Sequence, residues 1–140
     1  MNAAQTHMKA FSQVEIDLLE VLAKFPAVTL AVLFGSVATQ SQSSNSDLDI
    51  AVFAGRALSA QQKMALMAEI AQNTGRPVDL IDLSSVAEPL LGQIVRKGKR
   101  LLGSDVEFGK LISRHLMEQA DFMPYQSRLL AERRAAWIGK

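Results

Sequence analysis

The chain contains no cysteine and only two histidines among its 140 residues. Without thiolates it can form neither a disulfide framework nor a cysteine-based zinc site. No apolar run approaches the roughly 20 residues that a membrane-spanning helix needs, and the first residues lack the apolar segment of a secretion signal. We therefore expect a cytoplasmic protein with no membrane partner.

What the chain does contain is enough apolar sequence for one folded domain. Hydrophobic residues make up 49% of it and charged residues 21%, as in ordinary globular proteins. The charges are unevenly spread, because the first 95 residues carry five Lys/Arg against nine Asp/Glu and the last 45 carry ten against five. The basic part is either a solvated helix surface or a face for a phosphate chain or an acidic partner.

Apolar periodicity and turn residues predict alternating helices and strands. Strands are expected over 28–34, 47–53 and 78–83, with a short edge strand near 100–102. Helices are expected over about 12–25, 59–74, 84–97 and 106–137, the last kinked or broken at Pro124. Four methionines at helical spacing are expected in the core: Met64, Met67, Met117 and Met123. His115 is expected on a helix surface or in packing.

A Gly-Ser pair, Gly35 and Ser36, ends the first apolar strand. A glycine there lets the backbone approach a ligand closely, and exposed N–H groups beside a hydroxyl can hold phosphate oxygens. An ordinary strand-ending turn has the same sequence. The polar loop that follows, residues 39–46, leaves this end of the strand open to a ligand.

Two carboxylates, Asp47 and Asp49, open the second strand. Strand side chains alternate between faces, so both project from one side, where they repel each other unless a cation binds or one is protonated. Oxygen ligands without histidine or cysteine nearby suit Mg²⁺ or Mn²⁺ better than zinc. Alone, such a pair is also typical of a solvated strand end.

Together these residues follow the pattern Gly-Ser-(x10)-Asp-x-Asp. The chain resembles the DNA-polymerase-β-like nucleotidyltransferases, and most of all their minimal, stand-alone antitoxin form. The resemblance covers about residues 28–83 well. It implies an α/β (α+β) nucleotidyltransferase fold, a small mixed β-sheet flanked by helices. We expect one domain over 1–140, with a core over about 12–103 and a helical C-terminal arm over about 105–138.

The resemblance also implies the roles of the site residues. Asp47 and Asp49 would bind metal and act in catalysis together with a third carboxylate from a later strand. Asp79 fits the family pattern better than Asp82, which we expect to be a helix-cap-region or surface acid. Two Mg²⁺ ions (or Mn²⁺) would act with ATP as co-substrate, and the nucleotide would be bound by Gly35, Ser36 and Ser46.

One segment departs from the family pattern. Many relatives carry Arg and Gly shortly after Gly-Ser, whereas residues 37–40 here read Val-Ala-Thr-Gln. A basic contact to the nucleotide is therefore missing. Lys97, Lys99 or Arg100 could replace it, or could simply form a solvated helix end.

The function implied by this resemblance is protein adenylylation by an antitoxin, which would transfer AMP from ATP to a tyrosine hydroxyl of a cognate HEPN-type RNase toxin and so neutralise it. The expected partners are that helical toxin and ATP, with no direct contact to nucleic acid. Two alternatives stay open. One is a small-molecule (antibiotic) nucleotidyltransferase, although only about 35 residues remain for an acceptor domain. The other is a non-catalytic toxin-binding module.

Overall fold

A mixed four-stranded sheet lies at the centre of the computed structural model, which describes residues 11–35 and 47–138, without the side chains of 122–127 and 135–138. The strand order is β3-β2-β1-β4, with β2 and β3 parallel and the other neighbours antiparallel. The mixed sheet confirms the predicted fold class. The strands are β1 (Leu30–Phe34), β2 (Leu48–Phe53), β3 (Val78–Asp82) and β4 (Lys99–Leu102).

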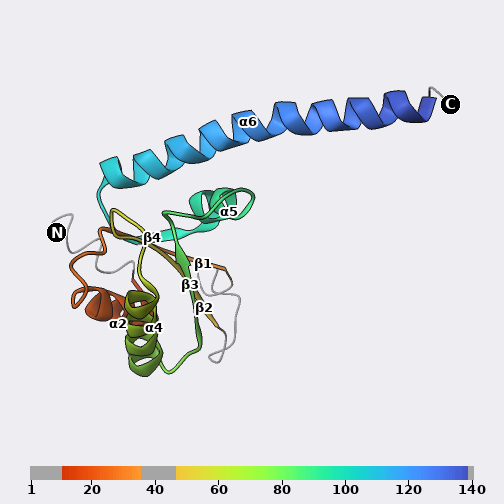
Figure 1. Cartoon of the computed structure of the whole chain (residues 1–140). Coiled ribbons are helices and arrows are strands. Elements are labelled where there is room, and N and C mark those ends of the chain that lie inside the picture. The colour runs from red at the N-terminus through yellow and green to blue at the C-terminus, as the bar shows by residue number, and fades with distance from the viewer. Residues whose placement is uncertain (1–10, 36–46, 139–140) are drawn as a thin grey trace.

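Helices cover both faces of the sheet (Figure 1). α2 (Gln13–Leu22) and α4 (Ala60–Thr74) pack on one face, while α5 (Leu90–Lys97) and the start of α6 (Asp105–Ile138) pack on the other. Alternation along β2 divides the core, because Leu48, Ile50 and Val52 join the cluster of α2 and α4, whereas Ala51 and Phe53 join the cluster of α5 and α6. Any odd-numbered residue of β2 therefore faces the α5 side.

Capping residues set the ends of the helices on the first face. Ser12 and Ser59 accept hydrogen bonds from backbone N–H groups of the turns they open, and Ser59 forms the predicted capping box with Gln62. Gly75 ends α4 in the left-handed conformation (φ +71°) expected of a glycine C-cap. The Gly75 turn sends the chain directly into β3, which carries the candidate third carboxylate.

The sequence misplaced two features here. The helix expected from residue 84 begins only at Leu90, because Asp82 binds the amide and hydroxyl of Ser84 and holds the intervening segment as an irregular loop. Met64 and Met117, predicted as core residues, are exposed. In α4 the core positions are Leu66 and Ile70, one turn apart, so the buried stripe lies on a different side of the helix from Met64.

The last helix, α6, runs for 34 residues and extends well past the sheet (Figure 1). It is continuous through Pro124, so the predicted break is wrong, and Figure 1 shows only a gentle curve. Proline removes one backbone donor and crowds one carbonyl, and the residues on both sides, which include Gln, Leu, Ala, Glu and Arg, favour helix strongly. One weakened turn is therefore held between two helix-forming segments. Among the described residues, no helix has the length and apolarity to cross a bilayer.

Two adjacent residues fasten the start of α6 to the loop after β3. The Arg114 guanidinium donates to the carbonyl oxygens of Leu83 and Val86, each at 2.6 Å. The neighbouring His115 is buried and its Nδ1 bonds the Glu88 carboxylate. His115 is thus a packing residue, and the alternative of a surface position is wrong.

Candidate active site

One row of residues crosses the sheet at the edge where β2 and β3 begin and β1 ends. Asp49 of β2 pairs with Asp79 of the parallel β3 on one side and with Phe34 of β1 on the other. Asp47 directly precedes β2, and Gly35 directly follows β1. The fold therefore brings together all the predicted site residues that the structure describes: Gly35, Asp47, Asp49 and Asp79.

Asp49 and Asp79 lie on the face of the sheet that α5 covers. Each is followed two residues later by a side chain packed in the α5–α6 cluster, Ala51 on β2 and Ile81 on β3. Because side chains two apart in a strand share a face, both carboxylates belong to that side. Asp79 is exposed and Asp49 half-buried, so the pair is open to a ligand at the rim of the sheet.

The electrostatics of this edge work against three free carboxylates. Burial raises the pKa of Asp49, the negative charges of Asp79 and Asp47 raise it further, and a hydrogen bond to the Asp79 side chain adds to the effect. Like charges held this close favour either a retained proton or a bound cation. In residues 11–35 and 47–138, no three His, Asp or Glu side chains are already arranged as metal ligands, and Asp49 and Asp79 share their hydrogen bond instead.

The donor set nevertheless fits a hard divalent cation. Among residues 11–35 and 47–138, the acidic side chains at this edge are Asp47, Asp49 and Asp79, and carboxylate oxygens suit Mg²⁺ or Mn²⁺. A cation there would offset the negative charges of Asp79 and Asp47, which add to the effect of burial in raising the Asp49 pKa.

Gly35 sits directly against the carboxylate of Asp49. Its φ is +75°, a conformation that side chains disfavour, and a Cβ placed there would lie 2.2 Å from Asp49 Oδ2. Only glycine leaves room for both the turn and the carboxylate. Ser36 and Ser46, the other two predicted nucleotide-binding residues, lie outside the described residues.

Asp82, the rival to Asp79, has a different role. Its side chain is 6% exposed and accepts hydrogen bonds from the Leu58 amide (2.8 Å) and from the amide and hydroxyl of Ser84 (2.9 and 2.7 Å). Burial alone would raise the pKa of Asp82, but these hydrogen bonds, with the charge of Lys63, outweigh burial and hold it below the usual value. Asp82 is a buried cap-region acid, and the alternative of a surface acid is wrong.

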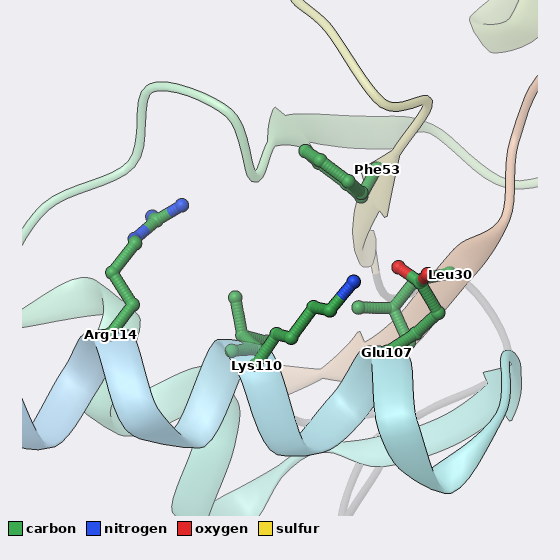
Figure 2. A pocket seen from close by; sticks show the side chains of 6 residues that line it. Leu30, Phe53, Glu107, Lys110 and Arg114 are labelled. Carbon is green, nitrogen blue, oxygen red and sulfur yellow. The ribbon is translucent and has the colours of Figure 1, made fainter.

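A pocket of about 200 Å³ lies elsewhere, at the opposite end of β1 and β2. Leu30 and Phe53, which pair with each other four residues from the Phe34–Asp49 pair, form its apolar side. Figure 2 shows Lys110 and Arg114 rising from α6 toward Phe53. The sequence did not single out Arg114, since an arginine on a charged helix carries no signal that it will bind carbonyls of a distant loop.

Comparisons with known proteins agree with the carboxylate edge. The profile of the family described as polymerase beta, nucleotidyltransferase matches residues 17–107. The protein adenylyltransferase MntA of Shewanella oneidensis is 39% identical over 79 residues, 56% of this chain and 57% of that protein. The alignment thus spans little more than half of this relative.

Solved structures extend the likeness to the whole fold. A toxin–antitoxin structure with AMP-PNP is similar at 28% identity and a TM-score of 0.75, over 86% of this chain and 98% of that one. A complex of tri-AMPylated Shewanella oneidensis HEPN toxin with MNT antitoxin is similar at 30% identity and a TM-score of 0.63, over 84% and 96%. The family match contains all four strands and the carboxylate edge, and the chain belongs to the polymerase beta nucleotidyltransferase family.

Proposed function

We propose that this chain is a protein adenylyltransferase and antitoxin, which transfers AMP from ATP to a tyrosine hydroxyl of a cognate HEPN-type toxin and so neutralises it. The observation that carries the proposal is the pairing of Asp49 with Asp79, beside Asp47 and Gly35, at one open sheet edge. The similar MntA protein is a protein adenylyltransferase, and the similar complexes contain an AMPylated HEPN toxin or an ATP analogue.

In this proposal Asp47, Asp49 and Asp79 would hold two Mg²⁺ ions, which when bound would neutralise the triphosphate and lower the pKa of the incoming hydroxyl. Asp79 would also take the hydroxyl proton. The acceptor oxygen bonds to the α-phosphorus as the bond to the bridging oxygen breaks, and pyrophosphate leaves. Gly35, with Ser36 and Ser46, binds the phosphates, because a backbone without a side chain admits them closely.

The same proposal assigns the parts of the chain. Residues 12–103 form the nucleotidyltransferase core, which is supported by the two apolar clusters on either side of one sheet. Residues 105–138 form a helical arm. Beyond His115 the arm carries exposed apolar residues, including Leu116, Leu129 and Leu130, as expected of a helix that binds another protein.

The direct test is to incubate the purified chain with ATP, Mg²⁺ and the purified HEPN-type toxin and to measure the toxin's mass. We expect the toxin to gain the mass of one or more AMP groups on tyrosine, and chelation of Mg²⁺ to stop the reaction. Asp49→Asn should abolish the gain. Asp17→Asn is the matched control, since Asp17 lies on α2, on the opposite face of the sheet.

Equal labelling by wild type and Asp49→Asn would contradict the proposal. So would a toxin that is neutralised without any gain in mass, which would favour inhibition by docking alone. If the toxin stays unmodified but hydroxylated antibiotics gain AMP, the acceptor is a small molecule.

A further inference from the structure

The acids of the carboxylate edge cannot neutralise the negative charge of a bound nucleotide. A nucleoside triphosphate bound beside Asp47, Asp49 and Asp79 adds several negative charges to a site where like charges already raise the Asp49 pKa. Even with divalent cations, phosphates beyond the reacting one are normally held by a lysine or arginine. Arg76, just before β3, already has an interaction partner. The other candidate cations come from the end of α5 and from β4.

Basic residues reach the edge from β4, the neighbour of β1. Leu33 of β1 pairs with Lys99, so the antiparallel register carries Gly98 to the level of Phe34. Lys97, the last residue of α5, directly precedes Gly98. The backbone at Gly98 is pressed against β1, because a Cβ there would lie 2.4 Å from Val32 Cγ1 and 3.3 Å from the Leu33 oxygen. This close packing fixes the backbone at Gly98, and Lys97 directly precedes it.

Two of the three candidate cations are already engaged. The Lys99 ammonium lies 2.8 Å from the buried carboxylate of Glu15 on α2 and 5.2 Å from the centre of the Phe11 ring. Lys99 is therefore on the face opposite to Asp49. Arg100 shares the face of Asp49 but forms an ion pair with Asp105 at 2.8 Å. Its guanidinium also lies over the ring of Phe108 on α6.

Lys97 remains. It is exposed at the end of α5, the helix on the same face as Asp49 and Asp79. Among the residues that the structure describes, Lys97 makes no hydrogen bond or ion pair, whereas Arg96 donates its Nε to the Gly92 carbonyl. From the strand of Asp49 to the level of Gly98 is two strand spacings, about 10 Å. A triphosphate that begins at the carboxylates and extends across the end of β1 meets Lys97.

We propose that the Lys97 ammonium binds the β- and γ-phosphate oxygens of ATP and so holds the pyrophosphate as it leaves. This inference rests on the proposed nucleotidyl transfer and adds to it a phosphate-binding residue outside the Gly-Ser and Asp motifs. The plainer role is that of a cation that complements the carbonyl end of α5 and so adds slightly to stability. It would have no effect on nucleotide affinity.

The test is calorimetric binding of a non-hydrolysable ATP analogue and of AMP, with Mg²⁺, to wild type, Lys97→Gln and Lys97→Arg. Lys97→Gln should weaken binding of the ATP analogue about 10- to 100-fold, since hydrogen bonds to charged groups contribute about 1.5–3 kcal/mol. AMP, which lacks the β- and γ-phosphates, should bind both proteins equally. Lys97→Arg should keep most of the affinity for the analogue.

Lys110→Gln is the matched control, because Lys110 comes from α6 on the same side of the sheet but lines the pocket at the other end of the strands (Figure 2). It should bind the analogue like wild type. Equal affinity of wild type and Lys97→Gln would overturn the inference, as would equal losses for the analogue and AMP. Because binding needs no acceptor, a Lys97-dependent affinity without AMP transfer would overturn only the proposed function.

Discussion

The two ends of β3 carry acids that the fold treats in opposite ways. At its start, Asp79 is exposed and faces Asp49, whose pKa is raised by burial and by neighbouring carboxylates. At its end, Asp82 is buried, and three hydrogen-bond donors hold its pKa below the usual value. The two residues are three apart, so they also lie on opposite faces of the sheet.

This contrast separates an acid that stabilises the fold from the acids that we propose act in nucleotidyl transfer. Asp82 joins the start of α4 to the loop after β3, and its charge is fully compensated by protein groups. Within residues 11–35 and 47–138, every group that shifts the Asp49 pKa raises it, and a bound cation would counter that effect. The repulsion between acids that raises the Asp49 pKa therefore marks the carboxylate edge as a candidate site more clearly than the number of acids does.

The largest expected effect comes from removing the charge at the start of the strand. Asp79→Asn should lower AMP transfer by on the order of a thousandfold, because metal-assisted charge stabilisation contributes several kcal/mol. Its thermal unfolding temperature should stay at or slightly above that of wild type, since a repulsion is removed. Transfer assays and calorimetry on the same preparation test both points. A variant that is active and unstable would place Asp79 with the structural acids.

The next effect comes from the other end of β3. Asp82→Ala should lower the free energy of unfolding by about 2–3 kcal/mol, because it leaves the Leu58 amide and the Ser84 donors without their buried partner. The unfolding temperature should fall by several degrees, as measured by circular dichroism. Transfer per folded molecule should persist below that temperature. A stable but inactive Asp82→Ala would break the contrast.

The smallest effect concerns pH. The pKa of Asp82 is lowered on folding, so its stabilisation is present above the ordinary value of 3.8 and is lost as pH falls through the folded value. The pKa of Asp49 is raised from the same 3.8, so in metal-free buffer its contribution is present at lower pH and is lost as pH rises through the folded value. Chemical unfolding between pH 3 and 7 should therefore show a shallower acid-side loss of stability for Asp82→Asn than for wild type. Equal slopes would contradict the assignment.

Local sequence signals predicted the parts of the fold that local physics controls. The strand that became β1, the Ser59 capping box and the Gly75 turn follow from propensity and backbone freedom. Asp47 and Asp49 were predicted to project from one side because side chains alternate between the two faces of a strand. Pairing with Asp79 was available only as family resemblance, since the register between β2 and β3 is a tertiary property.

Other features depended on contacts that no local pattern encodes. The hydrogen bonds of Asp82 keep residues 84–89 out of a helix. Met64 is exposed because Leu66 and Ile70 form the buried stripe of α4, on a different side of the helix. Lys97, Lys99 and Arg100 looked equivalent in sequence. Only the pairing of β4 with β1, and the ion pairs of the last two, distinguish them.

The fastening of α6 has a mechanical consequence. Arg114 and His115 form hydrogen bonds to the segment from Leu83 to Glu88, which directly follows the strand of Asp79. Beyond them α6 continues to Ile138, about 35 Å at 1.5 Å per residue. If α6 turned by about 10° about Arg114 and His115, its far end would move by about 6 Å over this helical length. A protein bound at the far end of α6 would therefore transmit force to the segment that directly follows the strand of Asp79.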